Sequence, residues 1–140
     1  MRTIAELAAA LRSRTLSSVE LAQQALDCVA AAQPHLNAFI TVDEPGALAG
    51  ARAADAALAR GDAAALAGIP LAHKDVLMTQ GLRTTCGSRM LEHFVAPYDA
   101  DVVARLRNAG TVLIGKTNMV ASGVVEATLE IVRLGGGRAP

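Results

Sequence analysis

The sequence predicts an α/β fold with a mainly parallel sheet, because short strand-like segments alternate with segments of helical periodicity. Phe39–Val42 is aromatic and β-branched, and residues 111–115 form a short, fully apolar run typical of buried parallel strands. A helical pattern at 100–109 lies between the strand-like segments 68–76 and 111–115. A strand, a helix and a strand in this order indicate one βαβ crossover on a parallel sheet.

Two N-terminal helices are predicted, each from a capping box. Thr3 is followed three residues later by Glu6, and Ser17 by Glu20, the spacing at which both side chains satisfy free backbone N–H groups. We expect the second helix to end before Pro34, because the residue before a proline is disfavoured in helical conformation. Apolar residues at helical spacing follow both caps: Ile4, Leu7, Ala8 and Leu11, then Val19, Leu21, Ala22, Ala25, Leu26 and Val29.

Prolines and glycines delimit the remaining elements. An alanine-rich helix is predicted at 45–60, with its proline in the first turn and Gly61 at the C-cap. Pro70 places the strand at 68–76 at a sheet edge or at the start of the strand, since proline has no N–H for a ladder. The last predicted helix stops at Gly110.

Composition and charge exclude several classes of protein. The 140 residues carry 26 charged side chains, 13 basic and 13 acidic, so bulk electrostatics indicate neither a nucleic-acid nor a membrane surface. Cys28 and Cys86 are too few for a disulfide framework, lack the Cys-x-x-Cys spacing of metal sites and are expected to be reduced thiols. Without a secretory pattern or a run of about 18 apolar residues, a cytoplasmic location is predicted.

The segment Gly68-Ile-Pro-Leu-Ala-His-Lys-Asp75 places a lysine among apolar residues, where packing rarely requires one. Loss of solvation disfavours the ammonium form, so Lys74 is a candidate general base. The competing interpretation is a strand end whose lysine reaches water, with Asp75 as its neighbour. His73 is a candidate second base beside Lys74, but by alternation it points to the other face of the strand and is expected to be a surface or loop histidine.

Three further segments follow in order. They are Gly81-Leu-Arg-Thr-Thr-Cys-Gly-Ser-Arg-Met-Leu-Glu92, Tyr98-Asp-Ala-Asp-Val-Val-Ala-Arg-Leu-Arg-Asn-Ala-Gly110 and Thr111-Val-Leu-Ile-Gly-Lys-Thr-Asn-Met119. With the lysine segment, this block resembles the amidase signature family over nearly all of residues 1–119. The resemblance implies helices packed on a mixed, mainly parallel sheet. It also implies that Lys74 is the base of a Ser–cis-Ser–Lys triad.

The chain departs from the family after Met119. The family continues with a signature that carries both catalytic serines, in a run of the type Gly-Gly-Ser-Ser-Gly-Gly-Ser, and the 140 residues contain no such run. We therefore expect an N-terminal fragment whose sheet is incomplete. Residues 1–119 would be part of an amidase-signature domain, and residues 120–140 a divergent tail, which a shifted reading frame after Met119 or a truncated gene copy would explain.

Within the family, the block resembles the A subunits of glutamyl-tRNA(Gln)/aspartyl-tRNA(Asn) amidotransferases. Such a subunit hydrolyses glutamine, and the ammonia converts Glu-tRNA(Gln) or Asp-tRNA(Asn) to Gln-tRNA or Asn-tRNA. The implied partners are the B and C subunits, with charged tRNA, ATP and magnesium bound by a partner and no cofactor in this chain. Because Lys74 is present and both serines are missing, we expect the chain to be inactive. The alternatives are a fragment of a general small-amide hydrolase and a non-catalytic piece that docks the other subunits.

Three other features receive a structural interpretation. Gly110-Thr-Val-Leu-Ile-Gly-Lys-Thr117 fits the written template of a phosphate loop, but residues 111–115 are predicted to be the strand itself, so nucleotide binding is not expected. Ser88 suits the N-cap of a short helix at 89–93. Ser122 lies in the tail and has no partner serine at the signature spacing.

We predict that proteases cut the tail before they cut the domain. Helical spacing at 124–134 does not anchor the tail, because short isolated helices are marginal in water. Limited proteolysis should cleave between Met119 and Arg138 well before it cleaves within 68–116. Deleting the tail should leave the circular dichroism spectrum and the solubility unchanged or improved, and unfolding of 68–116 on deletion would contradict this boundary.

Overall fold

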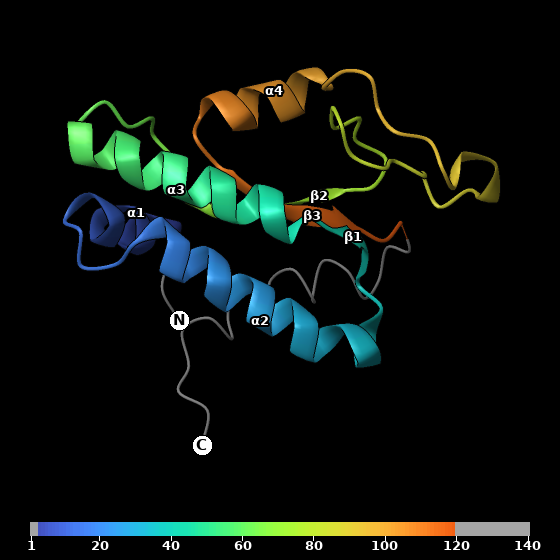
Figure 1. Ribbon diagram of the computed structural model, residues 1–140, viewed down its shortest axis with the longest axis horizontal. Helices are drawn as coiled ribbons and strands as arrows, with labels where there is room; N and C mark the ends of the chain where they lie inside the picture. Colours follow the sequence, from blue (N-terminus) through green and yellow to red (C-terminus); the bar gives the residue numbers. More distant parts are fainter. Residues whose placement is uncertain (1–2, 120–140) are drawn as a thin grey trace.

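The structure is a computed structural model that describes residues 3–119. Two helices come first along this part of the chain, and strands and helices are interspersed after them (Figure 1). None of the described helices is long and apolar enough to cross a membrane. In chain order the elements are α1 (Ile4–Arg12), α2 (Ser18–Leu36), β1 (Phe39–Val42), α3 (Glu44–Arg60), β2 (Pro70–Lys74), the 3-10 helix η1 (Arg89–Leu91), α4 (Asp101–Asn108) and β3 (Val112–Thr117).

The described strands form one mixed sheet in the order β1-β3-β2. β3 is central, pairs antiparallel with β1 and pairs parallel with β2. α4 lies between β2 and β3 in the chain, so the predicted βαβ crossover is confirmed. The predicted α/β class with a mixed sheet is confirmed as well.

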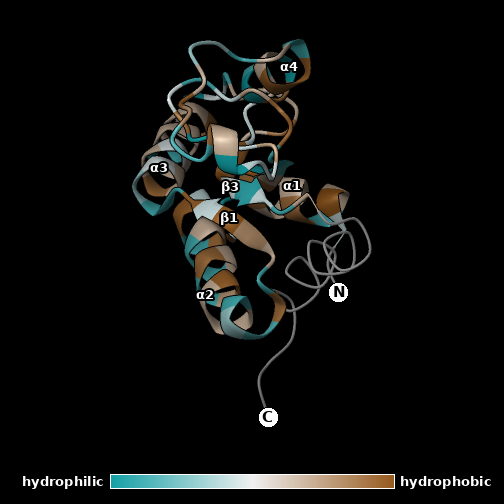
Figure 2. Cartoon of the chain, turned by 90° about the vertical axis from the view of Figure 1, so that its right-hand side faces the viewer, coloured by the Kyte–Doolittle hydropathy of each residue, from teal (hydrophilic) through white to brown (hydrophobic). Residues whose placement is uncertain are grey.

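Helices cover both faces of this sheet. Figure 2 shows α4 on one side of the strands and α2 on the other. Val112 and Ile114 of β3 pack in the main core with α2 and α3, whereas Leu113 lies beside Val103 of α4. The buried members of the main core are Ala22, Ala25, Leu26, Val29, Ala38, Phe39, Ala47, Ala51, Ala54, Val112 and Ile114.

The ladder between β2 and β3 contains an irregularity that matters for the site. On β3 the pairing steps from Leu113 to Gly115 while β2 advances by one residue, so Ile114 is an extra residue. An extra residue changes the face toward which the following side chains point. Lys116 therefore turns its ammonium toward the loop that follows β2 instead of away from it.

The predicted helix starts are confirmed, but one helix end is wrong. Both capping boxes are present, at Thr3 and at Ser17. α2 does not end before Pro34 but continues to Leu36. The proline lies in the last turn, where its missing N–H removes one helical hydrogen bond. Asn37 then ends the helix in a left-handed conformation with a φ of 45°.

Other predicted elements differ only at their ends. β2 starts at Pro70, which is its first residue and lies on an edge strand of the described sheet. β3 continues to Thr117, past the predicted end at 115, because residues 115–117 pair with both neighbouring strands. Ser88 is confirmed as an N-cap, since its Oγ accepts a hydrogen bond from the N–H of Met90. The predictions for residues 120–140, including Ser122, lie outside the described residues.

We predict that Gly115→Ala destabilises the chain by about 1–3 kcal/mol, as overpacking in a core does. A Cβ at this position would fall against the carbonyl oxygen of Thr41 and within 3.0 Å of the Val42 Cα, at the junction of β1 and β3. Gly50→Ala is the matched control. Its new methyl group would meet only Val112 Cγ1, at 3.9 Å, and alanine favours the helix. Urea unfolding should show a lower midpoint for the first variant and an equal or higher one for the second.

Candidate active site

Lys74 is the last residue of β2, and hydrogen bonds on both sides fix its backbone. The N–H of the next residue, Asp75, donates to the Thr117 carbonyl at 3.0 Å, and the Leu77 N–H donates to the Lys74 carbonyl at 2.9 Å. The Lys74 side chain itself is exposed. The expected desolvation of this amine is therefore wrong for the described residues. The competing interpretation, a strand end whose lysine reaches water, agrees with the exposed position of the Lys74 side chain.

The surroundings of Lys74 follow from strand direction. β2 and β3 run parallel, so their carboxyl ends meet at one edge of the sheet. In parallel α/β sheets this edge is the usual place for ligands. The loop after β2 returns to the same edge, where Cys86 and Gly87 both have positive φ, 52° and 68°. A Cβ on Gly87 would lie 3.4 Å from the Met119 Cβ, so this loop borders the chain just after β3.

Asp75 follows Lys74 in the sequence, but its carboxylate pairs with a different lysine. Its side chain is completely buried, and its Oδ1 lies 3.5 Å from the Nζ of Lys116, which is also completely buried. Its Oδ2 accepts hydrogen bonds from the N–H of Thr85 at 2.9 Å and from the Thr85 hydroxyl at 2.6 Å. Strand alternation explains this arrangement, because neighbours in a strand point to opposite faces.

Lys116 belongs to strand β3. The segment 110–117, which fits the template of a phosphate loop, is therefore mostly a strand and not a loop. The ammonium donates to the Leu77 carbonyl at 2.8 Å and to the Thr84 hydroxyl at 2.9 Å. Burial lowers the pKa of Lys116, while the Asp75 carboxylate beside it opposes that shift. This buried pair was not predicted from the sequence, where its only signal was a lysine at the end of an apolar run.

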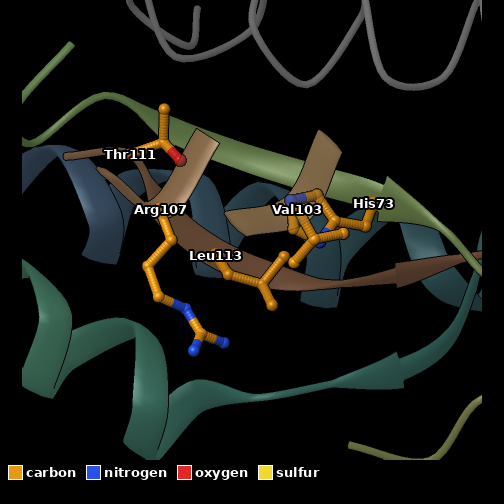
Figure 3. A pocket seen from close by; sticks show the side chains of 5 residues that line it. All are labelled: His73, Val103, Arg107, Thr111 and Leu113. Atoms are coloured by element: carbon orange, nitrogen blue, oxygen red, sulfur yellow. The ribbon is translucent and has the colours of Figure 1, made fainter. Parts of the chain in front are cut away.

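His73 is not the surface or loop histidine that was expected. It is 5% exposed and lies with Val103, Arg107, Thr111 and Leu113 around a small pocket between β2 and α4 (Figure 3). Alternation correctly placed it opposite Lys74. The helix that covers that face comes later in the chain, and this cover could not be inferred from the strand pattern alone.

The protonation of His73 follows from its contacts. The Thr79 hydroxyl donates to the Leu77 carbonyl at 3.1 Å, so it accepts from the His73 Nδ1–H at 3.3 Å. Burial lowers the pKa of His73 to about 4, and the nearby Lys116 charge acts in the same direction. The imidazole is therefore neutral at pH 7. Its Nε2 has no hydrogen-bond partner among the described residues.

No group of three or more His, Cys, Asp or Glu side chains within residues 3–119 is arranged to hold a metal ion. The titratable groups at the carboxyl edge include an exposed lysine, whose backbone is held by hydrogen bonds, and a buried ion pair next to it. An exposed amine can exchange protons with a group brought to it, whereas the buried pair is enclosed by its own partners.

Comparison with known proteins supports the resemblance found in the sequence. The family model described as Amidase matches residues 20–133. The chain belongs to the amidase family. The match runs past Met119, and the proposed boundary at that residue stays a prediction.

Two curated relatives illustrate the match, and both have the same name. The A subunit of glutamyl-tRNA(Gln) amidotransferase from Azoarcus sp. (strain BH72) is 61% identical over 117 residues, which cover 84% of this chain and 24% of that protein. The protein of the same name from Coxiella burnetii (strain RSA 493 / Nine Mile phase I) is 55% identical over 118 residues, with the same coverage of 84% and 24%. The chain thus spans about a quarter of the length of the curated relatives it matches.

Solved structures show the same fold. The native peptide amidase from Stenotrophomonas maltophilia aligns with a TM-score of 0.77 at 39% identity, over 82% of this chain and 24% of that one. A structure described as a vestigial protein complex that reveals the origins of an s-triazine catabolic enzyme aligns with a TM-score of 0.80 at 33% identity, over 84% and 26%. The amidase-signature fold is confirmed over the matched part.

We predict that His73 makes the stability of the chain depend on pH. Its pKa is about 4 in the folded chain and 6.5 ordinarily, so between these values the unfolded chain binds more protons. The free energy of unfolding should fall as the pH is lowered from 6.5 toward 4, by on the order of 3 kcal/mol. Urea titrations across this range measure the slope. His73→Gln should reduce it, and a slope unchanged by that substitution would contradict the assignment; His35→Gln, at an exposed position, is the control.

Proposed function

We propose that this chain is the lysine-bearing N-terminal part of a glutamine-hydrolysing amidotransferase A subunit, and that it has no amidase turnover by itself. The observation that carries the proposal is the place of Lys74. It lies at the carboxyl end of β2, on a backbone fixed by β3, with its amine accessible. The identity of 61% to a curated A subunit supports the same assignment.

In the chemistry that we propose, Lys74 is the base that takes a proton from a bridging serine. That serine takes one from a nucleophilic serine, which attacks the side-chain amide of glutamine and forms an acyl-enzyme while ammonia leaves. A base without these serines has nothing to deprotonate. The described residues supply the base and its support, and the 140 residues contain no serine run of the signature type.

The tRNA-linked branch is favoured over a general amide hydrolase. The curated A subunits share 55% to 61% of residues with this chain, compared with 39% for the solved peptide amidase. We therefore propose the B and C subunits as partners, with charged tRNA, ATP and magnesium bound by a partner and no cofactor in this chain. Because tRNA-dependent amidation serves protein synthesis, we propose the cytoplasm as its location.

The test is a hybrid in which residues 1–119 of this chain replace the matching segment of the Azoarcus A subunit. We expect the hybrid, assembled with its partners, to release ammonia from glutamine, and Lys74→Ala to lower that rate by about 10²–10⁴-fold, as removal of a general base does. Arg52→Ala, at an exposed position on α3, is the control and should leave the rate unchanged.

The purified 140-residue chain should release no ammonia from glutamine in the same assay. Turnover by the purified chain that disappears in Lys74→Ala would contradict the proposed inactivity and require an unrecognised nucleophile. A hybrid that keeps its full rate without Lys74 would contradict the triad role itself.

A further inference from the structure

The chain has two lysines, Lys74 and Lys116, and the structure gives them opposite environments. They lie on adjacent strands at the same edge of the sheet, one exposed and one completely buried. Burying an ammonium and a carboxylate without water is costly unless further hydrogen bonds satisfy both groups. A buried ion pair is thus weak evidence that the pair stabilises the fold. Its role has to be inferred from the groups that it contacts.

The contacts of the Lys116 ammonium clamp both ends of one loop. The Leu77 carbonyl is at the start of the loop that follows β2, and the Thr84 hydroxyl is near its end. Asp75 makes a second connection, because its Oδ2 is held by both the N–H and the hydroxyl of Thr85. These side chains therefore tie residues 75–85 back onto the centre of the sheet.

The clamped loop is continuous with the backbone of Lys74. The Asp75 N–H donates to the Thr117 carbonyl, and the Leu77 N–H donates to the Lys74 carbonyl. These two hydrogen bonds fix the backbone at the point where β2 passes into the loop. The exposed Lys74 side chain has no hydrogen-bond or ion-pair partner of its own within residues 3–119, so its position depends on this backbone anchor.

We propose that Lys116 and Asp75 are positioning residues for Lys74. The buried pair holds the loop 75–85, and the loop holds the point at which the Lys74 side chain leaves the sheet. The same pairing neutralises the Asp75 carboxylate, so the carboxylate next to Lys74 in the sequence is not available to it as a counter-ion. The catalytic relevance of this arrangement rests on the proposed function of Lys74.

Two backbone hydrogen bonds make a sharp test possible in the full chain. The Asp75 N–H donates to the Thr117 carbonyl at 3.0 Å, and the Asp43 N–H donates to the Ile114 carbonyl at 2.9 Å. Both are aspartate amides bound to carbonyls of β3, one on each side of that strand. Global destabilisation lowers their hydrogen-exchange protection together, whereas loss of positioning lowers the protection of Asp75 alone.

The first variant is Thr84→Val, which removes an acceptor from the Lys116 ammonium, and with it the weaker hydrogen bond from this hydroxyl to the Leu82 carbonyl at 3.3 Å, with little change in shape. We expect the ratio of the Asp75 to the Asp43 protection factor, measured by NMR, to fall about tenfold, as loss of a hydrogen bond to a charged group predicts. Thr84→Ser restores the hydroxyl and should keep the wild-type ratio. If the Lys116→Met variant folds, its protection ratio should be lower still. If it does not fold, the comparison of Thr84→Val with Thr84→Ser tests the proposal.

A ratio that stays at its wild-type value in folded Thr84→Val would overturn the proposal, because the pair would then serve stability only. So would a loss that Thr84→Ser does not restore. These amide measurements need no turnover, so they are independent of the glutaminase assay on the hybrid. If the ratio falls and the hybrid does not need Lys74, the anchor exists and the proposed function fails.

Discussion

The buried ion pair between Lys116 and Asp75 is the constraint on which the carboxyl edge of the sheet depends. It joins the central strand to the loop after β2, at a distance of 3.5 Å with both side chains completely buried. Removing one partner would leave an uncompensated charge in the interior. The free-energy cost of that charge is far larger than the net stabilisation that the intact pair provides. The loop therefore has little freedom to leave the sheet.

Local signals made much of this fold predictable. The capping boxes at Thr3 and Ser17 and the order of strand, helix and strand involve residues close in sequence, so a pattern of spacing contains them. The end of α2 was wrong for a related reason. Avoiding Pro34 is a local preference, whereas the last turn of α2 is held by hydrogen bonds that Gln33 makes with Asn37 and with the backbone of Phe39.

The candidate site was less predictable, because its geometry depends on contacts between distant residues. The extra residue at Ile114 turns Lys116 toward Thr84. The sequence of β3 contains no pattern that predicts this extra residue. His73 is buried because α4 covers it, although an alternating strand is equally compatible with an exposed histidine. A lysine in an apolar segment pointed to chemistry at Lys74, while the lysine that is actually desolvated is Lys116.

The two lysines show why structural and chemical roles need different surroundings. A charge that anchors a loop must be surrounded by partners, and Lys116 has a carbonyl, a hydroxyl and a carboxylate within reach. A base must instead be free to lose its proton to solvent or to a group placed beside it. Strand direction brings both lysines to the same end of the sheet, and the extra residue in β3 gives Lys116 enclosed surroundings while Lys74 stays accessible. One lysine points into the loop, and the other leaves the edge where, in our proposal, the serines of the triad would meet it.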